Sequence, residues 1–328
     1  MKRHICIPII IMSIIFIIPQ NAYAFKYGLG SCLDQRFDQA IWSSIKKENI
    51  DGFIFLGDNV YGDHPNGSLA MMEDAYKIQK NRLPKWLMNE KEILAIWDDH
   101  DFGLNDGGKD YPLKKQAELM FLNFWNIPAS DIRRKREGIY FKETKNIDGA
   151  KVEIIGLDTR YFRSKLIGNK NEYLPNKSPN ASILGKDQWQ WFKSQMINSN
   201  ADIIIILSSI QVLATDHPYE KWSNFPSERK KLLDLISNTK KNKAIIVVSG
   251  DRHRAGLYKS KNFFEITASS LNKPGSSFKE SDKHLINQTF PEINYGILEI
   301  KPLQRKITIS IHNENGILLN SQIITLNN

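Results

Sequence analysis

The sequence predicts an α/β fold in which two sheets pack together with helices outside them. Apolar runs of strand length, rich in Ile and Val, alternate with helix-length segments through most of the chain. The last part of the chain holds only strand-like runs and turns, which predicts an antiparallel region. With 328 residues, of which 41% are hydrophobic and 25% charged, the chain can bury a substantial core.

The predicted elements follow in order. Strand-like runs in the alternating part cover 25–31, 52–56, 93–97, 138–144, 151–157, 202–207 and 244–249. Helices, with apolar residues three and four positions apart, cover 38–47, 68–83, 113–125, 187–198 and 227–237. Strands of the tail cover 263–268, 295–300, 306–311 and 318–324. The stretches 163–185 and 213–226 predict long surface loops, which in compact domains are usually functional or mobile.

Residues 1–24 have the pattern of a secretory signal peptide. A basic start precedes an apolar run at 5–18, and Ala-Tyr-Ala at 22–24 offers a cleavage site. A membrane-spanning helix needs about 20 apolar residues, so this run is short for a span, and a retained anchor is the alternative. We therefore expect export, to a periplasm or beyond.

The formal net charge of +9 favours anionic partners such as phosphate esters or acidic lipid headgroups. A solvated basic surface is the alternative, and it explains the net charge alone better. The lysines are scattered, and no stripe of basic and aromatic residues predicts specific nucleic-acid recognition. The sequence contains no GxxxxGK[ST], GxSxG or HExxH, so it lacks the signatures of P-loop proteins, serine hydrolases and zinc proteases.

Polar side chains follow the ends of five strand-like runs. These residues are Cys32, Asp58, Asp99, Asp158 and Asp251, each with polar neighbours. Because residues just past the strand ends line one crevice in an open α/β sheet, we expect metal-ligand chemistry along a single edge. The pattern indicates a metal-dependent hydrolase.

The segment 97–101, Trp-Asp-Asp-His-Asp, is the densest of these groups. Three acids and His100 within four positions repel one another or bind cations, since like charges disfavour ionisation. The alternative is a helix N-cap with acidic residues in the first turn. A cap needs only one acid, which favours the metal site.

Two other motifs supply further candidate ligands. Gly57 permits a sharp turn after its strand, so that Asp58 can bridge two cations and Tyr61 can fold back toward one of them. Asp251 and His253 lie two residues apart, so in an extended segment they point the same way. The alternative for both motifs is an ordinary polar turn.

Cys32 and Arg160 each allow two interpretations. Cleavage of the leader would leave Cys32 as a lone thiol, either a metal ligand or a small buried core residue. Arg160 can bind phosphate through paired hydrogen bonds, or it can form an ion pair with a nearby acid such as Asp158.

Taken together, GSC, GDNVYGD, WDDHDFGLNDGG, LDTR, LSSIQ and GDRH, in this order and spacing, resemble the PhoD-like (alkaline phosphatase D) family of calcineurin-like metallophosphoesterases. The resemblance covers about 25–268, and the tail fits the second sheet. It implies one domain at 25–328, with a core at 25–270 and C-terminal strands at 293–326. It also implies a four-layer αββα sandwich of two mixed sheets, whose two-metal centre activates water for in-line attack on phosphate mono- or diesters.

The resemblance implies a ligand set for the first cation. Asp58 would bridge both cations, and Cys32, Tyr61 and His253 would complete the first site. A thiolate and a phenolate suit iron(III).

The second cation would be held by Asp99 and Asp251, with Asn59 and Asn105 as further candidates. These oxygen donors suit calcium, manganese or magnesium. His100 would act as general acid, Asp101 would orient it, and Arg160 would bind the substrate phosphate.

Two other functions stay open. One is a phospholipase-like phosphodiesterase acting on lipid headgroups at a membrane surface. The other is an exported metal-binding protein without catalysis, which would be expected to lack ligands, whereas every expected ligand position is filled.

Overall fold

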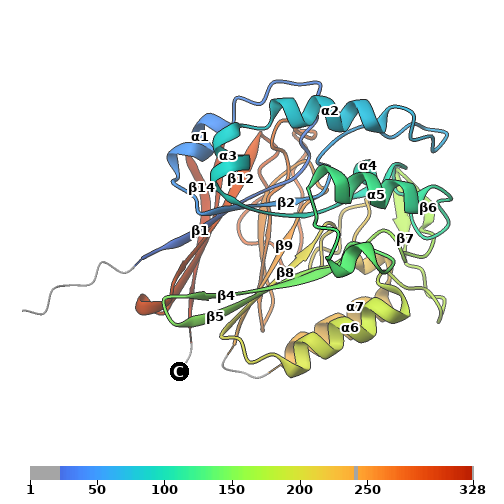
Figure 1. Ribbon diagram of the computed structural model, residues 1–328. Coiled ribbons are helices and arrows are strands. Elements are labelled where there is room, and N and C mark those ends of the chain that lie inside the picture. The colour runs from blue at the N-terminus through green and yellow to red at the C-terminus, as the bar shows by residue number, and fades with distance from the viewer. Residues whose placement is uncertain (1–22, 240–242, 327–328) are drawn as a thin grey trace, which may run out of the picture.

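In the computed structural model, which describes residues 23–239 and 243–326, two mixed six-stranded sheets face each other (Figure 1). The strand order of the first sheet is β14 (Leu318–Thr325), β13 (Lys306–Asn313), β12 (Asn294–Lys301), β1 (Phe25–Gly30), β2 (Gly52–Leu56) and β3 (Glu92–Ile96). Strands β1, β2 and β3 are parallel, and β12, β13 and β14 continue the sheet in antiparallel pairs. The antiparallel tail is therefore confirmed, and it extends the sheet that begins with β1.

The second sheet has the same size and a similar plan. Its order is β10 (Gly256–Lys259), β11 (Phe264–Thr267), β9 (Ala244–Ser249), β8 (Ile203–Ser208), β5 (Ala150–Gly156) and β4 (Phe141–Ile147). Strands β11, β9, β8 and β5 are parallel, and the edge strands β10 and β4 are antiparallel to their neighbours. The predicted strands 138–144 and 151–157 form the antiparallel hairpin β4–β5.

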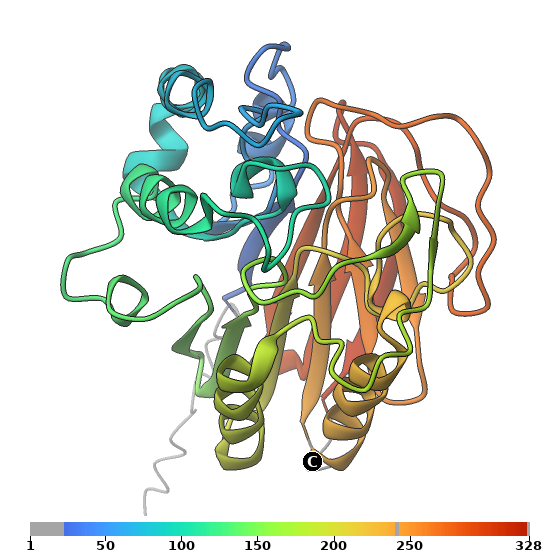
Figure 2. The same ribbon diagram turned by 90° about the vertical axis from the view of Figure 1, so that its right-hand side faces the viewer.

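Helices cover the outer face of each sheet. Those beside the first sheet are α1 (Trp42–Lys47), α2 (Met72–Arg82), α3 (Lys85–Glu90) and α5 (Lys114–Phe124). Those beside the second are α6 (Gly185–Asn198) and α7 (Pro226–Asn238). In Figure 2 the yellow and orange helices α6 and α7 lie on the opposite side of the sheets from the blue and cyan helices. This arrangement confirms the predicted four-layer fold.

Strand β8 shows how the sequence produces these layers. Alternate side chains of a strand point to opposite faces of the sheet. Ile203 and Ile205 belong to the core between the two sheets, whereas Ile204 and Ile206 pack with Phe192 of α6 in a second cluster. A strand buried on both faces therefore reads as an uninterrupted apolar run.

Several element boundaries differ from the prediction. Helix α1 begins at Trp42 and α2 at Met72, four residues later than predicted for each. Helix α2 ends two residues before Pro84, whose fixed φ also suits the position before a new helix, and α3 begins at the next residue. The first predicted loop contains the hairpin β6 (Ile167–Asn169) and β7 (Glu172–Leu174), and the second contains the short helix η2 (Trp222–Asn224).

The N-terminal leader lies almost wholly outside the described residues, since 1–22 are not among them, and the signal peptide stays a prediction. In the part of the chain that is described, no helix has the length and apolar character needed to cross a bilayer.

Candidate metal centre

The candidate ligands come from the carboxyl ends of strands in both sheets. Cys32 follows β1, Asp58 follows β2, and Asp99 follows β3 of the first sheet. Asp251 and His253 follow β9 of the second sheet. The expectation of a single sheet edge was therefore wrong, because the site lies where the ends of two sheets meet.

The backbone is strained at four of these ligand positions. Cys32, Asp58, Asp251 and His253 have φ values of 55°, 51°, 67° and 51°. This left-handed region is uncommon for residues with a Cβ and costs about 1–2 kcal/mol per residue. Such strain gathers where side chains must point in a required direction. Here it turns each side chain sharply away from the preceding strand.

Asp58 lies at the centre of the first donor cluster. Its Oδ2 is 3.5 Å from the Cys32 sulfur and accepts a hydrogen bond of 3.1 Å from the Tyr61 hydroxyl. The Tyr61 oxygen lies 3.4 Å from Nε2 of His253. Donor atoms of Cys32, Asp58 and His253 all lie within 4.8 Å of one another. The four ligands predicted for the first cation therefore converge.

A second cluster shares Asp58. One oxygen each from Asp58, Asp98, Asp99 and Asp251 lie within 4.8 Å of one another. Asp98 was not predicted as a ligand, and its Oδ1 is already occupied by Ser209 at 2.7 Å. The oxygens of Asp99 and Asp251 thus stand beside the Asp58 carboxylate, as the second predicted site requires.

The electrostatics of the clusters fit bound cations. Burial, together with the charges of Cys32 and Asp99, raises the pKa of Asp58 well above its usual range. Burial and the charge of Asp99 also raise the pKa of Asp251 to about 7. Burial raises the pKa of the Cys32 thiol. Buried acids that resist ionisation in this way are stabilised by a positive charge among them, and sulfur, nitrogen and oxygen donors of this kind bind metal ions.

His100 faces the site from the short helix α4 (Asp99–Phe102) and is held by an unpredicted partner. Its Nδ1 lies 2.6 Å from Oδ1 of Asp63. One of its ring nitrogens is also within 4.8 Å of oxygens of Asp58 and Asp99. Although burial alone would lower it, the charges of Asp99 and Asp58 raise the pKa of His100 to about 10.

The prediction that Asp101 orients His100 was wrong. The Asp101 carboxylate accepts hydrogen bonds from the backbone N–H groups of Asn59, at 3.0 Å, and Asp98, at 3.0 Å. Asp101 therefore ties the end of β2 to the start of α4. Asp98 and Asp101 point inward at the start of α4 and form its N-terminal cap, whereas Asp99 and His100 face the site. The helix-cap alternative is therefore correct for Asp98 and Asp101 only.

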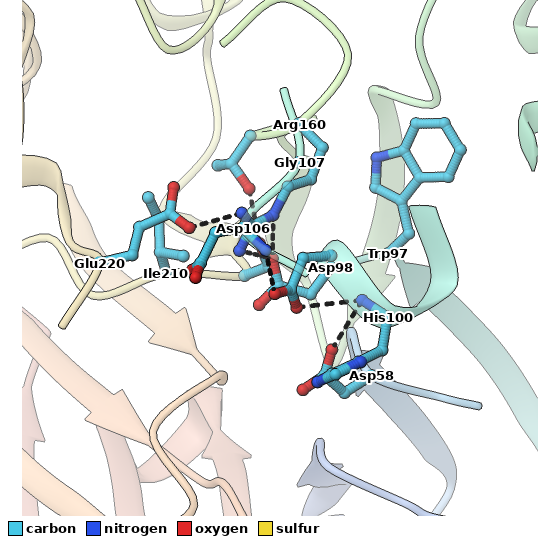
Figure 3. A network of polar contacts seen from close by, with 12 residues as sticks. Asp58, Trp97, Asp98, His100, Asp106, Gly107, Arg160, Ile210 and Glu220 are labelled. Atoms are coloured by element: carbon cyan, nitrogen blue, oxygen red, sulfur yellow. Dashed lines mark hydrogen bonds and ion pairs between the residues drawn. The ribbon is translucent and has the colours of Figure 1, made fainter. Parts of the chain in front are cut away.

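The prediction that Arg160 binds substrate was also wrong. Its side chain is completely buried and does not line the cavity above the ligands. Figure 3 shows it between two acids, with ion pairs to Asp98 and, at 2.5 Å, to Glu220. Arg163 reaches the other oxygen of Glu220 at 2.8 Å. Arg160 thus neutralises buried acids behind the ligands, as the ion-pair alternative predicted, although its acids are not Asp158.

The two asparagine candidates lie in different places. Asn105 lines the cavity and donates to Oδ2 of Asp106 at 2.7 Å. Asn59 is buried, does not line the cavity, and donates to the carbonyl of Ile96 at 3.0 Å. Its Oδ1 has no hydrogen-bond partner among the described residues.

A cavity of about 380 Å³ opens above the ligands, lined by Asp58, Asp99, His100, Asp251 and His253 among others. Positive charge on its wall comes from Lys170, Arg252 and Arg254. The sequence analysis missed the last two, although both lie within the segment 251–254 that supplied ligands. It also missed Asp63, which lies two residues after Tyr61.

Comparisons with known proteins agree with this geometry. A sequence model of the PhoD-like phosphatase family matches residues 86–302. Alkaline phosphatase D of Bacillus subtilis (strain 168) is 23% identical over 302 residues, which cover 77% of this chain and 49% of that protein. The chain therefore spans about half the length of this curated relative.

Two solved structures share the fold. GAP50, the anchor in the inner membrane complex of Plasmodium, has a TM-score of 0.64 at 10% identity, covering 93% of this chain and 90% of its own. Purple acid phosphatase PPD1 from yellow lupin (Lupinus luteus) seeds has a TM-score of 0.60 at 10% identity, covering 93% of this chain and 54% of its own. At these identities the likeness shows the fold alone. The family match spans more than half of the sequence, and this chain belongs to the PhoD-like phosphatase family.

Proposed function

We propose that the chain is a metal-dependent phosphoester hydrolase with a two-metal centre. The observation that carries the proposal is the position of Asp58, whose carboxylate belongs to both donor clusters. A carboxylate has two oxygens and can bridge two cations. The wall of the cavity directly above it includes Lys170, Arg252 and Arg254, cationic groups of the kind that pair with a phosphate ester.

The residues divide between two sites. Cys32, Asp58, Tyr61 and His253 would hold one cation, and their thiol and phenol favour iron(III). Asp58, Asp99 and Asp251 would hold the other, with calcium, manganese or magnesium suited to the oxygens. Bound cations would neutralise phosphate oxygens and make water acidic enough to act as the nucleophile.

The remaining chemistry belongs to the side chains. His100 lines the cavity, and Asp63 occupies its Nδ1, which leaves Nε2 to give a proton to the leaving-group oxygen. Lys170 on the cavity wall would draw the anionic ester into the cavity, whereas Arg252 is already paired with Glu280. The signal-like sequence of residues 1–24 supports a site of action outside the cytoplasm.

The test combines metal analysis with turnover of phosphate monoesters and diesters by the natively metallated protein. We expect two cations per chain, hydrolysis of at least one ester class, and a visible absorption band from iron bound by phenolate or thiolate. Cys32→Ser should weaken that band and lower the iron content. Fully metallated protein that cleaves none of a broad ester panel would exclude the hydrolase.

His100→Ala separates the two roles that the geometry allows for this side chain. As general acid, His100 contributes about 100- to 10,000-fold to turnover, and its loss should leave the metal content near normal. Loss of one cation in this variant would instead assign His100 as a ligand.

A further inference from the structure

A second cavity adjoins the one that holds the metal ligands. It measures about 430 Å³ and shares Tyr219, Arg254 and Ser276 with the first. His217 and Phe278 line the second cavity only. The predicted metal ligands lie in or beneath the first cavity and none lines the second. The two cavities therefore lie side by side.

His217 lines the second cavity with both of its ring nitrogens buried. Only 8% of its surface is exposed, and neither ring nitrogen has a hydrogen-bond partner among the described residues. Burial and the nearby cations Arg252 and Lys221 lower the pKa of His217 well below its usual value. Neither ring nitrogen is exposed to a ligand in the cavity, so this part of the wall favours an uncharged group.

Two exposed aromatic rings stand on the wall of this cavity. Tyr219 is 47% exposed and Phe278 is 72% exposed, although large aromatic side chains are usually buried. The guanidinium of Arg252 lies 4.7 Å from the centre of the Tyr219 ring and is itself paired with Glu280. Tyr219 is therefore held in place as a platform on which a planar group can stack.

The charges in the second cavity are already balanced, which disfavours a second phosphate there. Arg254 donates to the carbonyl oxygens of Phe278 and Ser276 at 2.7 and 2.8 Å, and it lies 3.5 Å from Glu280. Lys279 and Asp216, of opposite charge, also line this cavity. An uncharged ring suits these surroundings better than an anion.

From this geometry we infer that the second cavity binds a planar, uncharged aromatic ring carried by the alcohol of the phosphate ester. The inference rests on the proposed function, because it names the class of ester that the metal centre cleaves. Tyr219 and Phe278 stack on this ring.

The direct test compares adenosine 5′-phosphate with ribose 5-phosphate, together with the methyl diester of each. Both compounds present a phosphate on the same primary alcohol and differ in the base. Stacking of a base on aromatic side chains predicts a kcat/KM about 5- to 150-fold higher for the adenosine ester. Phe278→Ala and Tyr219→Ala should each reduce this ratio through KM. Phe37→Ala, at a half-exposed ring outside both cavities, should leave it unchanged.

Binding of adenosine alone, measured by ligand-observed NMR, keeps the inference testable apart from catalysis. Adenosine should bind the wild-type protein and bind Phe278→Ala more weakly. Equal kcat/KM for the two esters, or failure of adenosine to bind, would overturn the inference. If adenosine binds but neither ester is cleaved, the proposed hydrolase fails while the second cavity stands.

Discussion

The burial of Arg160 makes a prediction that separates a structural role from substrate binding. Arg160→Met removes the cation that lies between Asp98 and Glu220, both of which are also buried. Removing one partner of a buried ion pair costs about 3–5 kcal/mol, because the remaining charge stays desolvated. Domains of ordinary stability unfold with about 5–15 kcal/mol, so the variant should lose about a fifth or more of its stability.

Urea unfolding of the metal-free protein measures this loss without a contribution from bound cations. Arg160→Lys keeps the charge but cannot reach both acids as a guanidinium does, so its stability should lie between that of Arg160→Met and that of wild type. Lys230→Met breaks an exposed pair with Asp234 and should change stability by less than about 1 kcal/mol. A loss below about 1 kcal/mol in Arg160→Met, accompanied by a raised KM, would refute the structural role and restore substrate binding.

Three further predictions follow from single residues. Asp63→Asn should lower kcat while leaving metal content and the urea midpoint near wild type, because Asp63 holds Nδ1 of His100. Asp101→Asn should lower the urea midpoint instead, and a lowered kcat in Asp101→Asn with an unchanged kcat in Asp63→Asn would restore Asp101 as the partner of His100. Gly57→Ala should destabilise the protein and reduce its metal content, because Gly57 has a φ of +101° and an added Cβ would lie 2.5 Å from Cβ of Asp98. A fully metallated, stable variant would show that the turn tolerates a side chain. Burial and the charge of Asp158 raise the pKa of Glu118 from 4.5 to about 8. Between these pH values the folded state binds more protons than the unfolded state, so the free energy of unfolding falls as pH rises. The free energy of unfolding of Glu118→Gln should match that of wild type below pH 4.5 and exceed it by about 1–2 kcal/mol above pH 8, after allowance for solvent screening, whereas parallel pH profiles would contradict the shift.

The sequence was sufficient for the strands and for most of the residues that converge at the candidate site. Apolar runs such as 203–207 are buried on both faces of a sheet, and the polar residue after each run lies at the end of that sheet. Cys32, Asp58 and Asp251 could be named for this reason. Which sheet each run joins depends on pairing between distant segments, and the meeting of two sheets at the site was therefore missed.

The errors concern residues whose role depends on direction. In the segment 98–101 the composition indicates cation binding, but one turn of helix divides the four side chains between the interior and the cavity. The Arg160 guanidinium could bind a phosphate, yet it is buried in an ion pair with Glu220, which lies sixty positions later in the sequence. Asp63 replaces Asp101 because the loop after β2 folds back over α4. No local pattern encodes these contacts.

The central claim is that Asp58 joins two cation sites at the meeting point of the two sheets. Anomalous diffraction from crystals of the natively metallated protein, recorded on both sides of the iron absorption edge, tests it directly. We expect two peaks, one on either side of the Asp58 carboxylate, with the iron signal confined to the side of Cys32, Tyr61 and His253. A single peak, or metal bound away from Asp58, would contradict the account.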